Sequence, residues 1–92
     1  MVIKIQKRIE WSFEKNLYLK KERGISFEVI EQLIISGHIL DIKQHYNQEQ
    51  YGHQKILIVS IDDYIYMVPF VEDDDKIFLK TIIPSRKLTK RY

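Results

Sequence analysis

Residues 55–70, KILIVSIDDYIYMVPF, contain two apolar runs separated by the pair Asp62-Asp63. Two runs of this kind, rich in β-branched and aromatic residues and joined by two turn-forming residues, are typical of a β-hairpin. We therefore predict strands over 55–61 and 64–70. Residues 56–59 are apolar without interruption, which indicates burial on both faces of the sheet. A partner or a second copy of the chain is one way to cover the second face.

Further strands are expected on both sides of this hairpin. Residues 72–75, EDDD, predict a turn that leads into another strand over 77–83. Before the hairpin, residues 38–43 predict a strand and residues 44–53, rich in Gln, Asn and His, predict a polar loop. At the N-terminus, residues 2–9 alternate between apolar and polar side chains, as in a short half-buried strand.

Two helices are predicted between residues 12 and 36. Ser12 is a suitable N-cap for the first, which continues to about Glu22, and Gly24 follows where a left-handed residue commonly ends a helix. Ser26 is a suitable N-cap for the second, which continues to Ser36-Gly37. Its apolar residues at helical spacing are Phe27, Ile30, Leu33 and Ile34.

Together these elements predict an α+β fold. It has one N-terminal strand, two helices, and then a three- to four-stranded antiparallel meander sheet that the helices cover on one face. A chain of 92 residues has room for one hydrophobic core, so we expect residues 1–92 to form a single domain.

Composition narrows the class of protein. The sequence is 45% hydrophobic and 30% charged, as in a soluble globular domain. It has no cysteine, which excludes a disulfide framework, a thiolate metal site and a cysteine nucleophile, and favours a reducing, cytoplasmic location. No apolar run approaches the roughly 18 residues of a membrane span, and no signal peptide is recognisable, so we expect no membrane association.

Charge is distributed unevenly along the chain. Residues 1–23 contain seven Lys or Arg and three Glu, residues 24–75 contain two Lys and ten acids, and residues 76–92 contain six Lys or Arg and no acid. If the fold brings the two basic ends together, they form one positive face that attracts a polyanion, more weakly as salt rises. The alternative is a solvated surface with no such role.

Three blocks of sequence resemble the BrnT-type toxin family of type II toxin–antitoxin systems. The first is EWSFEKNLYLKKERGISFE (10–28), where the matching residues are Trp11, Lys15, Gly24, Ser26, Phe27 and Glu28. The second is QKILIVSI with YMVPFVE, on either side of the hairpin turn. The third is TIIPSRKLTKRY (81–92), where the matching residues are Ser85, Arg86, Lys87 and Thr89.

The chain also departs from the family pattern. Residues that stand where the family commonly has others are Ser12, Leu19, Arg23 and Pro84. The family's C-terminal helix is expected to be almost absent, because the sequence stops at Tyr92. These departures suggest a divergent subgroup.

The resemblance implies a RelE-like fold and a metal-independent ribonuclease that cleaves mRNA, often on the ribosome, and so inhibits translation and growth. It also implies neutralisation by a cognate ribbon-helix-helix-like, DNA-binding antitoxin in a hetero-oligomer. Two other functions remain open. One is a non-catalytic module that binds RNA or the antitoxin through the basic face, and the other is a structural or regulatory subunit that works through its apolar sheet face.

Cleaving RNA without a metal requires a base, a fixed cation and an acid to meet at one phosphate. We assign charge stabilisation to Arg86, with Lys87 and Lys80 as supporting cations. We assign proton transfer to His45 or His53, although a histidine in a loop is commonly only a solvated polar residue. This mechanism uses no cofactor.

Six residues are candidates for RNA binding by charge or stacking: Lys15, Arg23, Lys90, Arg91, Tyr92 and Trp11. Trp11 has an alternative role in packing the start of a helix. The acidic run 73–75 is not expected to bind a metal, because consecutive carboxylates in a turn converge poorly. The assigned phosphate chemistry requires the N-terminal helix pair and the last strand to form one cationic pocket beside Arg86. Without that pocket, the toxin assignment rests on the resemblance alone.

Overall fold

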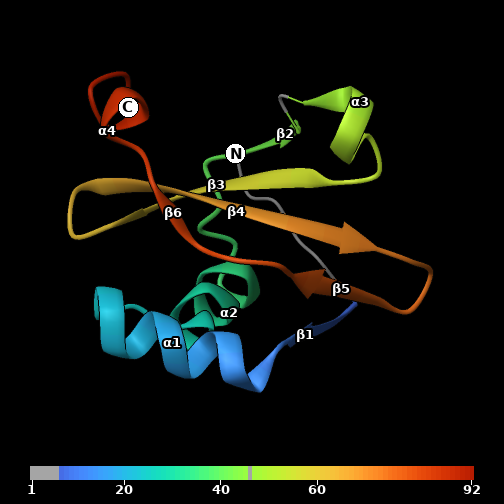
Figure 1. Ribbon diagram of the computed structural model, residues 1–92. Coiled ribbons are helices and arrows are strands. Elements are labelled where there is room, and N and C mark those ends of the chain that lie inside the picture. Colours follow the sequence, from blue (N-terminus) through green and yellow to red (C-terminus); the bar gives the residue numbers. More distant parts are fainter. Residues whose placement is uncertain (1–6, 46) are drawn as a thin grey trace.

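A mixed sheet with four helices makes up the described fold (Figure 1). The computed structural model describes residues 7–45 and 47–92. In chain order the elements are β1 (Arg8–Trp11), α1 (Phe13–Arg23), α2 (Phe27–Ile35), β2 (Asp41–Gln44), α3 (Gln48–Tyr51), β3 (Lys55–Ile61), β4 (Tyr64–Glu72), β5 (Lys76–Leu79), β6 (Ile83–Pro84) and α4 (Arg86–Thr89). None of the described helices is long and apolar enough to cross a membrane.

The strands lie in the order β1-β5-β4-β3-β2, and β6 pairs with β4. Neighbours from β2 to β5 are antiparallel, whereas β1 pairs with β5 in parallel. The predicted α+β class is confirmed, but the sheet is mixed rather than a meander with a separate strand. The strand predicted over residues 2–9 lies mostly outside the described residues, and the described strand β1 extends to Trp11.

The hairpin predicted from residues 55–70 is confirmed. Asp62 and Asp63 have φ values of 52° and 65°, and Ile61 pairs with Tyr64 directly across the turn. Positive φ at both central residues is the geometry of a two-residue type I′ turn, whose twist matches that of the strands. The segment predicted as a loop over 44–53 contains the short helix α3.

The three predicted helix caps are confirmed: Ser12 and Ser26 begin α1 and α2, and Gly24 ends α1. The Ser12 hydroxyl accepts a hydrogen bond from the Lys15 N–H, and the Ser26 hydroxyl accepts one from the Val29 N–H. Gly24 has a φ of 64° and donates its N–H to the Lys20 carbonyl. These contacts satisfy backbone groups that helix ends leave without partners.

A buried amide ties the two helices together. Asn16 is 4% exposed, and its side-chain oxygen accepts a hydrogen bond of 2.8 Å from the Phe27 N–H. Its NH₂ group donates to Glu28 at 2.7 Å, and this hydrogen bond is the main reason that the pKa of the Glu28 carboxyl is lowered. The Trp11 ring stacks on Phe27 with centroids 5.7 Å apart. The block GISFE therefore has a structural role at the helix junction.

The strand predicted over 77–83 is interrupted by a β-bulge. Strand β4 pairs first with β5 and then with β6, and between these stretches residues 68–69 of β4 face residues 80–82. The segment that follows β5 therefore has one residue more than β4 in this stretch. From that point on, side chains that would have faced one side of the sheet face the other. Ile82 consequently joins the buried core under the helices, a place that Thr81 would take in a regular strand.

The bulge explains how β4 tolerates Pro69. This residue lies inside the strand but has no N–H to donate to a neighbouring strand. The Pro69 carbonyl accepts a hydrogen bond of 2.8 Å from the Lys80 N–H. Because the nitrogen and carbonyl of one strand residue point to the same side, the Pro69 nitrogen also faces the bulge, where the regular hydrogen bonds are already interrupted.

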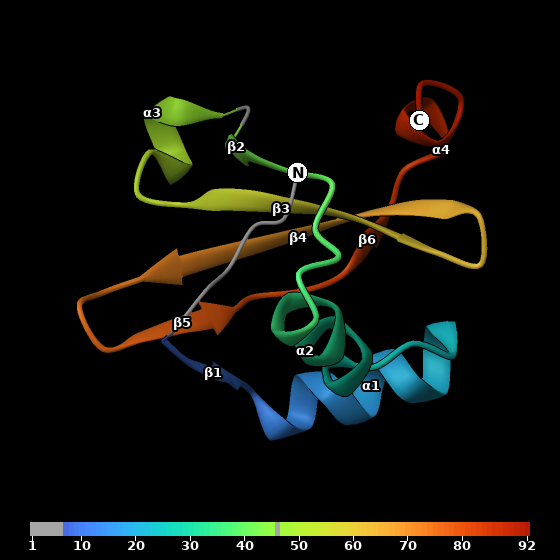
Figure 2. The ribbon, with the colours of Figure 1, turned by 180° about the vertical axis from the view of Figure 1, so that it is seen from behind.

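The sheet has a core on each face. Leu57 and Val59 of β3 belong to the larger core with α1 and α2, while Ile56 and Ile58 belong to a smaller core with Ile65, Met67 and Leu88. Figures 1 and 2 show α1 and α2 on one side of β3 and β4, and α3 and α4 on the other. Since Ile56 and Ile58 are only 4% and 1% exposed, burial of the second face occurs within a single chain. It does not require the partner or second copy that we considered from the sequence.

Candidate functional site

Helix α4 is fixed to the sheet through both backbone groups of Ile65. The Ser85 N–H donates to the Ile65 carbonyl at 2.9 Å, and the Ile65 N–H donates to the Thr89 hydroxyl at 2.9 Å. The Ser85 hydroxyl caps α4 by accepting from the Leu88 N–H at 3.1 Å. Ser85 and Thr89 therefore anchor α4, and both Arg86 and Lys87 between them are exposed.

A cavity of about 330 Å³ lies between this helix and the second sheet face, and we call it the α4 pocket. Its apolar lining consists of Ile56, Ile58, Met67 and Leu88. Its polar and charged lining consists of Lys43, Gln44, Ser85, Lys87 and Arg91. The charged residues described around the pocket are therefore all cations, which favours an anionic ligand with an apolar part.

The three cations of the α4 pocket come from two elements that are distant in the sequence. Lys43 lies on β2 opposite Ile56 of β3, and Lys87 and Arg91 belong to the C-terminal segment. Within the described part of the chain, none of these three side chains forms an ion pair. Their charges are not neutralised by a neighbouring carboxylate, so an incoming phosphate does not have to displace one.

The C-terminal candidates lie together around this pocket. Lys87 and Arg91 line it, whereas Arg86, Lys90 and Tyr92 are exposed on the same short segment. The sequence reasoning missed Lys43. The only available signal was strand alternation, which places Lys43 and the apolar residues 56 and 58 on one face once the register of β2 and β3 is known.

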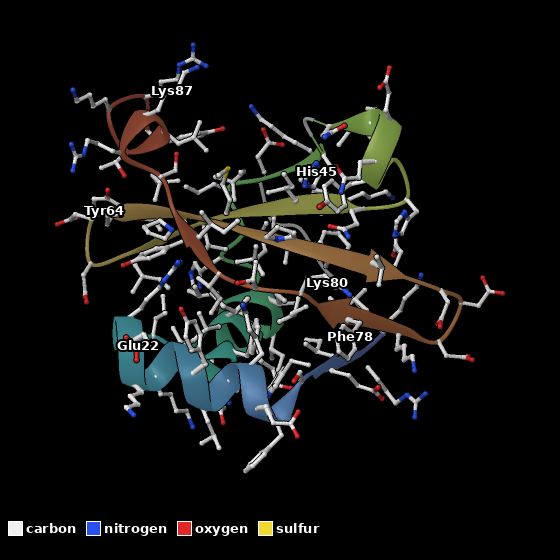
Figure 3. All side chains as sticks on the ribbon, viewed as in Figure 1. Glu22, His45, Tyr64, Phe78, Lys80 and Lys87 are labelled. Carbon is white, nitrogen blue, oxygen red and sulfur yellow. The ribbon has the colours of Figure 1, made fainter. Side chains whose placement is uncertain are left out.

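The remaining catalytic candidates lie elsewhere. Lys80 follows β5, with its ammonium 5.5 Å from the centre of the Phe78 ring. His45 is buried, packs its ring against Tyr51 at 4.6 Å, and accepts a hydrogen bond from the Asn47 N–H through Nδ1. Figure 3 shows Lys80, His45 and Lys87 at three separate positions, and His53 is exposed after α3. The five predicted catalytic residues therefore do not form one cluster.

The RNA-binding candidates of the N-terminal region lie on the side of the sheet that α1 and α2 cover. The Lys15 ammonium lies 5.2 Å from the Tyr18 ring centre, and the Arg23 guanidinium donates to the Ile82 carbonyl at 2.8 Å. Trp11 is partly buried and stacks on Phe27 against the larger core, in line with its alternative role of packing the start of a helix.

The predicted single cationic pocket is therefore wrong. The helix pair and the last strand meet where Arg23 contacts Ile82, but Arg86 belongs to α4 on the other sheet face. The physical reason is the path of the chain after the bulge, where β6 and α4 carry it from the larger core at Ile82 to the second core at Leu88.

The acidic run forms a turn. The Asp73 carboxylate accepts hydrogen bonds from the N–H groups of Asp75 and Lys76 at 2.8 and 2.9 Å, and these bonds lower the pKa of Asp73. Among the described residues, no group of three or more His, Cys, Asp or Glu side chains is arranged to hold a metal ion.

Comparisons with protein-family models, with curated proteins and with solved structures give no match to this chain.

Proposed function

We propose that this chain is the toxin of a bacterial toxin–antitoxin pair, with a RelE-like fold, and that it binds and cleaves RNA at the α4 pocket. The toxin assignment rests on the resemblance of residues 10–28, the central hairpin and residues 81–92 to the BrnT-type family. The proposed partner is a ribbon-helix-helix-like antitoxin, and the proposed compartment is the cytoplasm.

The observation that carries RNA binding is the composition of the α4 pocket. Lys43, Lys87 and Arg91 stand around an apolar floor and have no ion-pair partner within the described residues. A nucleotide combines a phosphate with a flat ring, and single-stranded RNA exposes both. A volume of about 330 Å³ is sufficient for one nucleotide rather than a duplex.

Cleavage is proposed from the position of Arg86. It is exposed and directly precedes Lys87 at the start of α4, and Lys87 lines the α4 pocket. Arginine can grip two phosphate oxygens at once and stabilise the charge that develops in the transition state.

A second candidate function is a non-catalytic module that binds RNA or the antitoxin through the same pocket. The separation of Lys80, His45 and Lys87 favours it, because acid–base cleavage requires its groups to meet at one phosphate. Both functions require RNA or an acidic partner at the α4 pocket, and only the first requires strand scission.

Binding is tested by fluorescence anisotropy with a labelled single-stranded RNA. We expect Lys87→Ala and Arg91→Ala each to weaken binding about tenfold, since each removes a charge-assisted contact of about 1.5 kcal/mol. Lys15→Ala is the matched control, because it removes a cation on the opposite sheet face and should leave binding unchanged. Equal losses in all three variants would show that binding follows net charge and does not use the α4 pocket.

Cleavage is tested by expressing the chain alone in bacteria. We expect growth arrest and loss of mRNA, with Arg86→Ala relieving both while the purified variant still binds RNA. A chain that binds RNA but leaves cells growing and mRNA intact is the non-catalytic module. A chain that neither binds nor cleaves RNA contradicts the ribonuclease and leaves only a module that binds the antitoxin.

A further inference from the structure

Helix α1 exposes apolar side chains on the outside of the molecule. Phe13 is 71% exposed and Leu17 and Tyr18 are each 50% exposed, while the buried residues of this helix are Asn16 and Leu19. Figures 1 and 2 both show α1 along an outer edge of the fold, with α2 between it and the sheet strands. Leu17 and Tyr18 are neighbours on this helix, and half of each side chain is accessible to a partner.

Charged residues stand at the two ends of this face. Glu14, Leu17, Tyr18 and Lys21 follow the spacing i, i+3, i+4 and i+7, which places all four on one side of a helix. Glu14 and Lys21 are about 10.5 Å apart along the axis and do not reach each other. Within the described residues neither forms an ion pair, although Glu14 accepts a hydrogen bond from the Ser12 hydroxyl at 3.4 Å.

We propose that two copies of this chain associate through α1, with the two helices antiparallel about a two-fold axis between Leu17 and Tyr18. In this arrangement Leu17 of each copy packs on Tyr18 of the other, and Glu14 of each copy faces Lys21 of the other. The four residues are symmetric about that point, so the face is complementary to itself, as a two-fold interface requires. This inference does not depend on RNA binding.

The charges also exclude the simplest alternatives. A parallel pair would place Glu14 beside Glu14 and Lys21 beside Lys21, which is repulsive at both ends. A uniformly acidic or uniformly basic partner helix would meet a like charge at one end. In an antiparallel pair of copies, unlike charges face each other at both ends. The two helix dipoles also point in opposite directions, which is favourable.

The expected association is weak. An eleven-residue helix is about 16 Å long, so two of them bury less area than a standard stable interface. We expect a dimer with a dissociation constant on the order of 10–100 μM.

Sedimentation velocity across a concentration series tests the arrangement with charge reversals. Glu14→Lys and Lys21→Glu should each weaken the dimer about tenfold, because each places like charges opposite one another. The double variant Glu14→Lys with Lys21→Glu should restore it, because unlike charges again face each other. Glu49→Lys is the matched control, since it reverses an acid in the first turn of α3 and should have no effect.

Three outcomes would overturn the proposal: a wild type that stays monomeric at about 1 mM, single reversals without effect, or a double variant no better than the single ones. Circular dichroism on each variant verifies that α1 remains folded. Because the proposal concerns self-association of RNA-free protein, its failure leaves the RNA measurements unaffected.

Disulfide trapping gives an independent measurement, because the chain has no cysteine. In the variant Glu14→Cys with Lys21→Cys, the two thiols of one helix are too far apart to bridge, since a disulfide needs Cα atoms within about 7 Å. Oxidation should therefore give a covalent dimer through two bonds between copies. The control Glu14→Cys with Glu49→Cys should give little, and equal trapping in both would contradict the α1 interface.

Discussion

Replacing Asn16 with alanine should destabilise the fold by removing the amide that joins α1 to α2. The Phe27 N–H is buried, and its side-chain acceptor at 2.8 Å is Asn16. Leaving a buried donor without a partner costs about 1–3 kcal/mol. For a domain of this size, each kcal/mol lowers the melting temperature by about 4–8 °C, so we expect Asn16→Ala to melt about 10 °C earlier.

Thermal unfolding followed by circular dichroism measures this change, and NMR titration of Glu28 provides a second readout. Because the Asn16 hydrogen bond is the main cause of the lowered pKa of Glu28, the pKa should rise toward its ordinary value in Asn16→Ala. Glu28→Gln is the control, since it keeps the bond between Asn16 and Phe27 and should melt close to the wild type. An unchanged melting temperature together with an unchanged Glu28 pKa would refute the role assigned to this amide.

Three further changes have defined outcomes. Thr89→Val removes the acceptor of the Ile65 N–H, so urea unfolding should show a loss of about 1–2 kcal/mol, and an unchanged stability would contradict the anchoring role of Thr89. Gly24→Ala adds a Cβ that meets nothing within 4 Å, so its cost should be only that of a left-handed backbone, about 1 kcal/mol by the same assay; a much larger loss would contradict this. The pKa of Glu72 is lowered by hydrogen bonds from Lys55 and Lys7, so its contribution to stability is present above about pH 4.3 and is lost as pH falls through the lower folded pKa. The difference in stability between wild type and Glu72→Gln should therefore shrink on acidification, and a constant difference would contradict the assignment.

Local signals predicted much of the fold. Ser12, Gly24 and Ser26 act on neighbouring backbone groups, so their roles depend on a few residues and can be recognised in sequence. The same holds for Asp62-Asp63, where loop length alone selects the turn. Helix α3 was missed because a four-residue helix in a polar segment has no apolar periodicity.

The site was harder to predict because it depends on contacts between distant residues. Lys43 joins Lys87 and Arg91 only through the pairing of β2 with β3 and the docking of α4. Counting charge along the chain grouped the two basic ends, yet α1, which carries Lys15 and Arg23, and α4 lie on opposite faces of the sheet. His45 appeared as a loop histidine, whereas packing against Tyr51 buries it.

The extra residue opposite Pro69 lets β5 and β6 pair with the same strand in registers that differ by one residue. With three residues against two, Ile82 turns toward the helices and the chain then crosses to the other side. Deleting Thr81 would close the bulge and leave Ile82 facing the helices, because Ile82 would take the place opposite Val68 and Ile83 would still pair with Met67. Connections at a protein surface usually accept insertions and deletions of any length. This one should accept the loss of Thr81, because β6 would keep its pairing with β4 and Lys87 and Arg91 would stay on the side of Lys43.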